Sequence, residues 1–379
     1  MNERVIPILK PLGVLAIAAG AAILLAIVAS QARFSTDPVP GAPLTDQYGN
    51  TLTLDQPAER IVTIPIPAAS MLIAVDGGAE RLVGTHPMSK SALQDGILGT
   101  FFPDARSIPS NVVGQGFMPN VEALLTLEPD LVLQWGHQGS GIVEPLRAAG
   151  LPVVLLRYGS EEDALGWLTL MGRITGKTER AQRLIDWRAT AVEEVRQAVA
   201  GVAAAQRPRV LFFQRYRSEL RVAGTGTYSD FYIDLAGGVN PAAEGKGWLT
   251  VEPERILAWN PEVILLNGVE DGLSPAEVYA NPLFADVAAV KNRRVYQLPL
   301  GGYRWDPPSH ESPLSWKWLA MLLHPDHATW PLRDEIADAY AWIYGQRPDS
   351  TQIDGVLRLD AHVDAARYAD LFAARQVVR

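Results

Sequence analysis

Residues 122–136 of the chain read EALLTLEPDLVLQWG, and residues 254–268 read ERILAWNPEVILLNG. The two stretches align without a gap at an offset of 132 residues, which is far longer than a solenoid repeat and close to the size of a lobe. Each predicts a short amphipathic helix, a stop before a proline, and an apolar strand that ends in glycine. The repeat therefore predicts two similar α/β lobes with a cleft between them.

The composition limits the class of protein. The chain has 379 residues, which is too long for one ordinary core and suits two lobes with appendages. It has no cysteine, which excludes a disulfide scaffold, a Cys-ligated metal cluster and a lipid on cysteine. The net charge of −9 disfavours nucleic acid or an anionic membrane surface as the partner. We expect a monomer that binds no nucleic acid.

Residues 1–32 predict a targeting segment. Arg4 and Lys10 precede an apolar stretch at residues 12–28, and residues 30–32 read SQA, a small-x-small cleavage site. The stretch has a length at the border between a signal peptide and a membrane-spanning helix, so a cleaved signal peptide and an uncleaved N-terminal anchor both stay open. Residues 33–43 are rich in proline and predict a linker.

The rest of the chain predicts two α/β lobes around a helical segment. An N-terminal lobe is expected over residues 44–160, because strands and helices alternate in an order typical of a mostly parallel sheet. Its predicted elements are a hairpin at 44–54, strands at 60–64, 82–84, 131–133 and 153–156, and helices at 68–75 and 142–149.

Residues 161–206 show only helical pattern. Within them, residues 178–205 predict a single helix about 40 Å long that acts as a rigid spacer. A C-terminal lobe is expected over residues 207–345, from a strand at 209–213 to a strand at 295–298, closed by helices at 315–323 and 332–344. Residues 346–379 predict a helical tail to which we assign no role.

An ordered set of short segments resembles one family. The segments are RIV at 60–62, LVG at 82–84, EPDLV at 128–132, LAGGVN at 235–240, GW at 247–248, NPEVI at 260–264 and KNRRVY at 291–296. Together they resemble the periplasmic substrate-binding proteins of ABC importers for ferric siderophores, haem and cobalamin, over residues 44–344. The chain departs from that pattern at residues 68–71, where many relatives carry a glutamate, and in lacking a lipid-attachment cysteine.

The resemblance implies an α/β fold of two Rossmann-like lobes joined by one long α-helix, with the ligand in the cleft between them. It also implies docking onto an inner-membrane ABC permease dimer and little closure on binding. The implied ligand is a metal chelate, with a ferric siderophore first and a corrinoid, haem or molybdate/tungstate as alternatives. Haem is disfavoured because no tyrosine or histidine axial pair is evident across the lobes.

Aromatic residues gather where strands end and loops begin. In open α/β sheets ligands lie outside the carboxyl ends of the strands, so these side chains are candidates for the cleft, although each alone could be an ordinary, partly buried aromatic. Trp248 also matches a family position that lines the cleft. The candidates are Phe117, Trp135, Tyr158, Tyr216, Tyr228, Trp248, Tyr303 and Trp305.

Charged candidates complete the predicted site. Arg215 and Arg304 stand beside aromatic residues, and guanidinium groups beside aromatic faces suit an anionic, flat ligand. His86 follows a predicted strand and points toward the cleft, but the sequence predicts no metal site of the protein's own and no cofactor. No catalytic motif is present; a membrane-tethered two-lobe enzyme acting on a small anion is the alternative from another class.

Glu122 and Glu254 occupy equivalent positions in the two copies of the repeat, in the first turn of each predicted helix. A glutamate there could simply complement the helix dipole, for about 0.3–1 kcal/mol. The resemblance instead implies that these glutamates pair with permease arginines, one on each lobe. We expect docking to be their main role.

Overall fold

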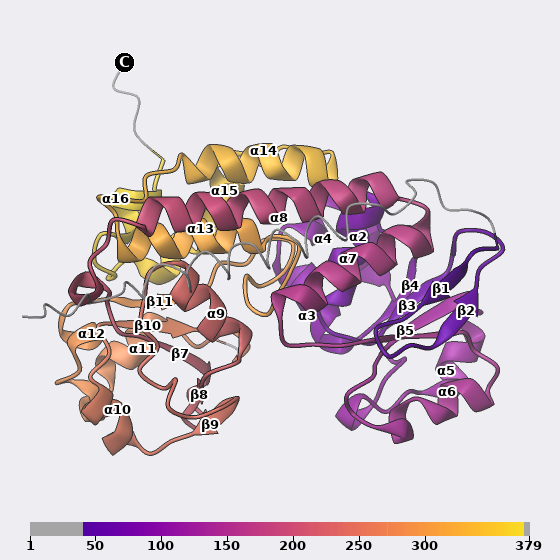
Figure 1. The fold of residues 1–379 in the computed structure, drawn as a ribbon, viewed down its shortest axis with the longest axis horizontal. Helices are drawn as coiled ribbons and strands as arrows, with labels where there is room; N and C mark the ends of the chain where they lie inside the picture. Colours follow the sequence, from indigo (N-terminus) through magenta and orange to yellow (C-terminus); the bar gives the residue numbers. More distant parts are fainter. Residues whose placement is uncertain (1–40, 271, 375–379) are drawn as a thin grey trace, which may run out of the picture. The chain divides into compact units, whose positions relative to one another are not determined.

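The structure, a computed structural model, describes residues 41–270 and 272–374. It begins with the predicted hairpin, β1 (Pro43–Thr45) paired antiparallel with β2 (Thr51–Thr53) (Figure 1). The carboxylate of Asp46 accepts hydrogen bonds from the backbone N–H of Tyr48 at 2.8 Å and of Leu155 at 3.0 Å. Asp46 therefore shapes the turn and also fastens the hairpin to the first lobe.

The predicted linker is too long at its C-terminal end. Pro43 lies in β1, and the N–H of Gly41 donates to the carbonyl of Leu54 at 3.3 Å, so both residues belong to the hairpin. The predicted signal peptide or anchor at residues 1–32 and the linker before residue 41 lie outside the described residues.

The first lobe holds a four-stranded parallel sheet in the order β4-β3-β5-β6. Its strands agree with the predicted ones and are almost entirely apolar and buried, as expected for parallel strands covered on both faces. They are β3 (Ile61–Thr63), β4 (Leu82–Thr85), β5 (Leu131–Trp135) and β6 (Val153–Leu156). The helices are α2 (Ala68–Asp76), α3 (Pro87–Asp95), α4 (Leu98–Phe101), α5 (Val121–Thr126) and α6 (Glu144–Ala148), with short turns η1 (Pro103–Ser107), η2 (Gln115–Phe117) and η3 (Ser140–Ile142).

Two long helices, α7 (Glu161–Thr175) and α8 (Thr178–Val199), follow the first lobe. The predicted spacer helix is shorter than expected: α8 has 22 residues, about 33 Å at 1.5 Å per residue, and ends at Val199 rather than at residue 205. Gly201 explains the early end, because glycine costs a helix about 1 kcal/mol relative to alanine. The N–H of Val202 donates to the carbonyl of Val199 at 3.0 Å in a tighter turn, before the short η4 (Ala204–Gln206).

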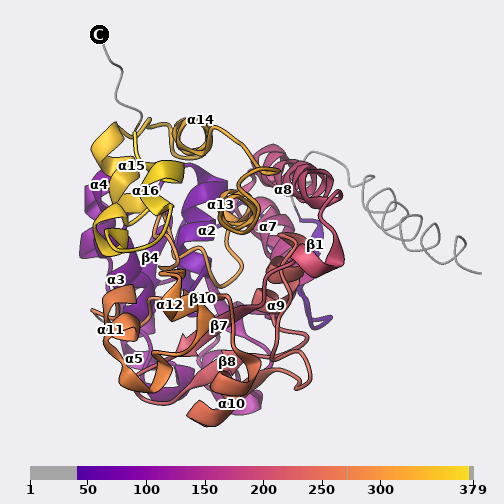
Figure 2. The same ribbon diagram turned by 90° about the vertical axis from the view of Figure 1, so that its left-hand side faces the viewer.

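The sequence predicts that the helices α13 (Ser312–Leu323) and α14 (Leu332–Tyr344) close the second lobe. In the structure they do more than this. They form a helical layer with α8, α13 against α8 and α14 against α2 of the first lobe (Figures 1 and 2). Arg180 of α8 ties this layer together, because its guanidinium donates to the carbonyls of Val75 at 3.0 Å and Ile343 at 2.7 Å, near the ends of α2 and α14. Every residue of α13 is buried, as expected for a helix in such a central place.

The second lobe holds a five-stranded mixed sheet in the order β11-β10-β7-β8-β9. Three strands are parallel: β7 (Val210–Arg215), β10 (Val263–Leu266) and β11 (Val295–Gln297). Two are antiparallel: β8 (Arg221–Ala223) and β9 (Trp248–Thr250). The sheet is accompanied by α9 (Tyr228–Leu235), α10 (Pro253–Trp259), α11 (Pro275–Ala280), η5 (Pro282–Phe284) and α12 (Ala288–Lys291).

The two copies of the repeat adopt the same structure. Both α5 and α10, and both β5 and β10, begin 132 residues apart, as the sequence predicts. Each helix is followed by a residue in the left-handed region at the same offset, Glu128 with φ 45° and Asn260 with φ 43°. An arginine caps each turn: Arg60 donates to the carbonyl of Glu128 at 3.2 Å, and Arg209 donates to that of Asn260 at 3.1 Å. The lobes are therefore internal repeats in their capping contacts as well as in their order of elements.

The tail is helical, as predicted, and packs on the second lobe. It consists of α15 (Ser350–Val356), η6 (Leu359–His362) and α16 (Tyr368–Phe372). The ring of Tyr368 stacks on His362 at 3.9 Å and on Tyr296 of β11 at 5.7 Å, and its hydroxyl accepts the Trp318 indole N–H at 3.1 Å. Among residues 41–270 and 272–374, no helix is long and apolar enough to span a bilayer.

Candidate ligand-binding site

Four predicted ligand residues of the first lobe form one aromatic cluster. His86 follows β4, Trp135 ends β5 and Tyr158 follows β6, so these side chains stand at the carboxyl ends of three strands of the same parallel sheet. Ring centroids are separated by 5.1 Å for His86–Phe117, 6.1 Å for Phe117–Trp135 and 5.5 Å for Trp135–Tyr158. Trp167 of α7 lies behind, 5.5 Å from Trp135. Candidates from separate loops thus converge on one surface.

His86 is held in a defined state. Its Nδ1 accepts the backbone N–H of Met88 at 3.0 Å, where His86 caps the N-terminus of α3. Burial lowers the pKa of His86 to about 4, so the imidazole is neutral at pH 7; because Nδ1 accepts a hydrogen bond, Nε2 carries the proton and can present a donor without bringing charge.

Two candidates of the second lobe, Tyr228 and Trp248, belong to another row of aromatic rings. Tyr228 starts α9 and lies 5.6 Å from Tyr232, which lies 6.4 Å from Phe212 of β7. Phe212 in turn lies 6.1 Å from Trp248, which is partly exposed at the start of the edge strand β9. This row occupies the face of the second sheet that carries α9.

The loop at residues 298–311 lies near both the aromatic cluster of the first lobe and the row of aromatic rings of the second lobe. It carries Tyr303 and Asp306, and burial raises the pKa of Tyr303 to about 12. The pKa of Tyr158 is raised well above its usual range, first by burial and then by the nearby groups Asp306, Tyr303 and Tyr228. Tyr228 of the second lobe and Tyr303 and Asp306 of this loop therefore lie around Tyr158 of the first lobe.

Asp306 belongs to this group but is not among the site residues predicted from the sequence. It is 3% exposed, its Oδ1 accepts the Ser229 hydroxyl at 3.0 Å, and it forms no ion pair within the described part of the chain. Burial raises its pKa to about 7. The sequence feature that could have identified Asp306 is a single acidic residue in an aromatic-rich loop, followed by two prolines.

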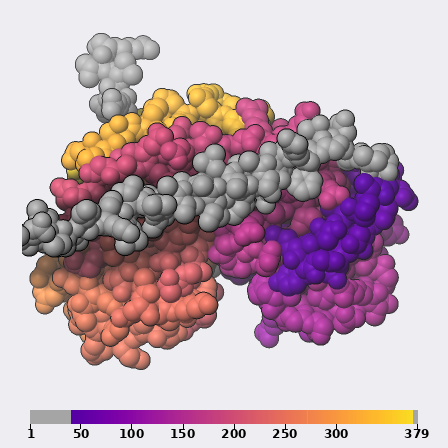
Figure 3. Space-filling model, in the orientation of Figure 1, coloured from indigo at the N-terminus to yellow at the C-terminus, as the bar shows by residue number. Residues whose placement is uncertain are grey.

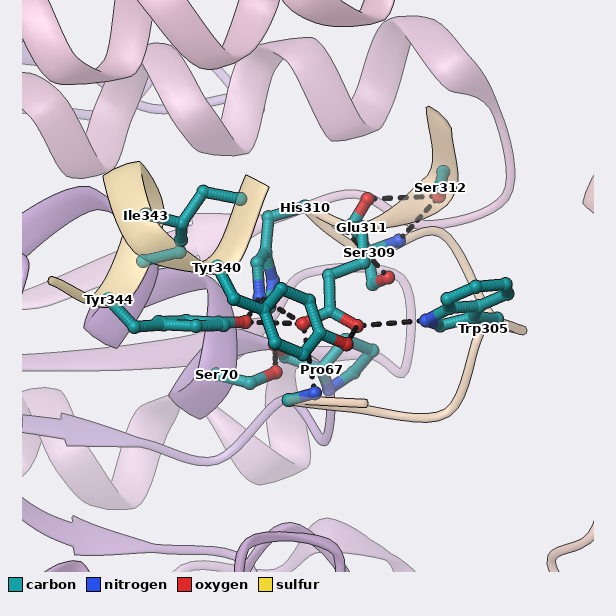
Figure 4. A network of polar contacts seen from close by, with 12 residues as sticks. Pro67, Ser70, Trp305, Ser309, His310, Glu311, Ser312, Tyr340, Ile343 and Tyr344 are labelled. Carbon is teal, nitrogen blue, oxygen red and sulfur yellow. Dashed lines mark hydrogen bonds and ion pairs between the residues drawn. The ribbon is translucent and has the colours of Figure 1, made fainter. Parts of the chain in front are cut away.

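Trp305, in contrast, does not face this group. Its side chain is 0% exposed, and its indole N–H donates to Oε2 of Glu311 at 2.8 Å. Glu311 also accepts the hydroxyls of Tyr340 at 3.0 Å and Tyr344 at 2.5 Å, so the loop is anchored to α14 (Figure 4). The predicted ligand contact of Trp305 is corrected here to a structural one, because a fully satisfied, buried indole has no surface to offer.

Tyr216 also lies apart from the other candidates. Alternation along β7 sends Phe213 to the opposite face of the sheet from Phe212, and the ring of Tyr216, just after the strand, packs there 5.4 Å from Phe213. Its hydroxyl accepts from Asn281 at 2.8 Å. Arg215, at the end of β7, is half-buried and makes no side-chain hydrogen bond or ion pair with the described residues, so its guanidinium is available.

The closed space at this site is small. A cavity of about 10 Å³ lies between Met71, Tyr158, Trp167 and Pro308, enough for about one water molecule. Below it the surface is hollowed between the residues of the first lobe and those of the second (Figure 3). The larger space at this site is therefore the open hollow between the lobes rather than a sealed chamber.

Glu122 and Glu254 lie where the repeat predicts them. Each is exposed and is the second residue of its helix, after Val121 in α5 and after Pro253 in α10. Three residues further along, Leu125 and Leu257 are 49% and 42% exposed. Residues three apart are neighbours on a helix surface, so each lobe presents an acidic group beside an uncovered leucine.

A family model for periplasmic binding proteins matches residues 69–300. The chain belongs to this family. The crystal structure of a periplasmic solute binding protein from Veillonella parvula is 32% identical, with a TM-score of 0.77 over 85% of this chain and 98% of the other. The two-lobed α/β fold that the resemblance implies is thus confirmed, and the chain belongs to a family of periplasmic binding proteins.

Curated relatives of the chain differ in the ligand that their names give. A cobalamin-binding protein of Halobacterium salinarum is 30% identical over 66% of this chain, and the chain spans 64% of that protein's length. A molybdate-binding protein of Haemophilus influenzae is 26% identical over 80% of this chain and 90% of its own length.

The residues described in the structure include no cluster of three or more His, Cys, Asp or Glu side chains suited to a metal ion. His324 and His327 are close in sequence but lie in the turn after α13, where the Nε2 of His324 is 3.0 Å from the carbonyl of Gly237. The cluster around Asp306 offers oxygen atoms and aromatic faces, which suit recognition of a bulky ligand better than capture of a bare ion.

Proposed function

We propose that this protein is a solute-binding protein that captures a metal chelate, a ferric siderophore in the first instance, and delivers it to an ABC importer permease. The observation that carries the proposal is the convergence of Tyr228, Tyr303 and Asp306, from the second lobe and the connecting loop, on Tyr158 of the first lobe. Such a set buries the apolar face of a large ligand and meets its oxygens with hydroxyl groups. Arg215 and Arg304 would balance negative charge on the chelate.

A corrinoid is the second candidate ligand. Support comes from the 30% identity to the halobacterial cobalamin-binding protein and from aromatic rings on both sides of the hollow, which suit a flat macrocycle. Asp306, about half protonated at pH 7 because burial raises its pKa to about 7, would add a hydrogen-bond donor toward amide groups in its protonated form.

Delivery would occur at the two lobes in a periplasm or an equivalent compartment, after export directed by residues 1–32 as a signal peptide or as an anchor. Glu122 and Glu254, each with its exposed leucine, form two equivalent patches that suit a two-fold symmetric permease. Attraction of acidic groups to basic permease residues would set orientation and speed of docking.

Titration of the purified protein with a ferric hydroxamate, a ferric catecholate, cobalamin, haem and molybdate tests the ligand proposal. Calorimetry should show micromolar or tighter binding of one chelate. Trp135→Ala and Trp248→Ala should each weaken that binding about ten-fold or more. Trp342→Ala, in the helical layer away from the hollow, is the matched control and should leave affinity unchanged. Failure of the whole panel to bind would contradict a chelate carrier.

A further inference from the structure

Two arginines of the second lobe have guanidinium groups that the described residues do not fully satisfy. Arg304, in the loop at residues 298–311, is 7% exposed; its Nε donates to the carbonyl of Gly268 at 3.2 Å, while its buried Nη1 has no acceptor. Arg358, between α15 and η6 of the tail, donates from Nη1 to Oε1 of Gln297 at 3.2 Å, while its buried Nε has no acceptor. Buried charged donors without acceptors are costly, so each needs an explanation.

The two guanidinium groups are neighbours. Gly268 and Gln297 follow or end the adjacent strands β10 and β11, and a Cβ atom on Gly268 would lie 3.0 Å from Nε2 of Gln297. Arg304 is bonded to the first of these residues and Arg358 to the second. The pKa of Arg358 is lowered, first by burial and then by the charge of Arg304, as closeness of like charges requires.

Nothing among the described residues neutralises this pair. Neither arginine forms an ion pair, although fifteen ion pairs join other charged groups in the described chain, Arg188 among them. The acid that acts on Arg358 is Asp95, exposed at the end of α3 and beyond ion-pair distance. His362 is no source of further charge, because burial lowers its pKa to about 4.

The backbone around Arg358 is held in place. The ring of His362 bridges the tail and the sheet: its Nδ1 lies 2.7 Å from the carbonyl of Arg358, and its Nε2 accepts the N–H of Gln297 at 2.9 Å. The N–H of Leu300 also donates to the carbonyl of Val356 at 2.9 Å. The tail thus runs beside the start of the loop that carries Arg304.

We propose that Arg304 and Arg358 form an anion-binding subsite that takes a carboxylate or tetrahedral oxyanion group, with the C-terminal tail supplying half of it. Two neighbouring guanidinium groups with free N–H donors match the paired oxygens of such a group. Tyr303 is adjacent to Arg304 in the loop and is near both Asp306 and Tyr158, so the anionic group belongs to the ligand held beside Tyr158. The identity of the ligand that this subsite would take rests on the proposed function. The preference of the subsite for an anion does not depend on that function.

Calorimetric titration of the full chain with sodium sulfate and, separately, with citrate tests the subsite. Wild type should bind at least one probe with a dissociation constant below about 1 mM, and the two probes separate an oxyanion preference from a carboxylate preference. Arg304→Gln and Arg358→Gln should each weaken binding about ten-fold or more, because each removes charge-assisted hydrogen bonds. Arg358→Lys keeps the charge, and its intermediate affinity would show that loss in Arg358→Gln is not unfolding.

Arg367→Gln is the matched control. Arg367 also lies in the tail, also has a left-handed backbone, with φ 61° against 53° for Arg358, and is exposed. Its replacement should leave probe affinity within about two-fold. The subsite is wrong if wild type binds neither probe, if both arginine variants bind as tightly as wild type, or if Arg367→Gln loses as much affinity.

The same variants separate this inference from the proposed function. Chelate binding that is equal in wild type and Arg358→Gln would overturn the subsite and leave the chelate carrier intact. Sulfate or citrate binding that depends on the two arginines, together with no chelate binding, would overturn the chelate carrier and leave the subsite intact.

Discussion

Arg188 of α8 and Glu161 of α7 form a buried ion pair, with Nε of Arg188 2.6 Å from Oε1 of Glu161. The same guanidinium donates to the carbonyl of Ser309 and lies 3.3 Å from the hydroxyl of Tyr228. One side chain therefore connects the helical layer, the loop at residues 298–311 and the second lobe. The ligand site is assembled around this connection.

Removal of Arg188 should strongly destabilise the protein. Arg188→Met leaves the Glu161 carboxylate without its partner, and breaking a buried pair from one side costs about 3–5 kcal/mol of unfolding free energy. Urea denaturation monitored by circular dichroism measures it. Arg147→Met, which breaks an exposed pair with Glu144, is the control and should change stability by less than about 1 kcal/mol. Equal losses in both variants would show that the Arg188 pair has no special role.

Stability should depend on pH through Asp306. Its folded-state pKa is raised from 3.8 to about 7, so its contribution is fully present below pH 3.8 and is lost as the pH rises through 7. Asp306→Asn removes this dependence. The unfolding free energy of wild type relative to Asp306→Asn should fall by about 2–3 kcal/mol between pH 5 and pH 8. Denaturant unfolding at the two pH values gives the difference, and a constant difference would mean that Asp306 titrates normally.

Loss of both docking glutamates should impair uptake without affecting the ligand. Glu122→Ala with Glu254→Ala should leave chelate affinity unchanged and cost only about 0.3–1 kcal/mol of stability for each lost dipole contact. Transport should fall more than in either single variant, because two contacts with a dimeric permease reinforce each other. Glu179→Ala, in the exposed first turn of α8, is the control. Normal transport by the double variant at equal expression would remove the docking role.

The exposed leucines beside those glutamates should contribute apolar contact. Leu125→Gln with Leu257→Gln should weaken association with the permease several-fold, because each leucine loses about 1 kcal/mol or more of burial. Leu283→Gln, at a 60% exposed leucine outside the repeat, should have no effect. Surface plasmon resonance with the permease in nanodiscs compares the three proteins. An unchanged affinity of the double variant would restrict docking to electrostatic contacts.

A structural feature could be predicted from the sequence when it depends on residues close together in the chain. The repeat at residues 122–136 and 254–268 predicted α5, β5, α10 and β10 because helix periodicity, a proline stop and a buried strand are local signals. The end of α8 was missed because Gly201 acts together with a turn at Val202, and a single glycine inside a helical pattern does not fix where a helix ends.

The site was only partly predictable for the same reason. Loop ends after parallel strands meet at one edge, so the aromatic cluster of the first lobe could be inferred. The burial of Trp305 depends on Glu311 and on Tyr340 of α14, and the position of Arg358 depends on the packing of the tail. Such contacts join residues far apart in sequence, and no local pattern records them.

Native mass spectrometry of the protein purified from its own cells, without added ligand, tests the central claim most directly. We predict a population of protein carrying one non-covalent metal chelate, released on denaturation with the isotope pattern of its metal, and lost from a Trp135→Ala/Trp248→Ala variant but retained by Trp342→Ala. Protein that is ligand-free in every preparation, and that also binds no chelate on titration, would contradict a chelate carrier.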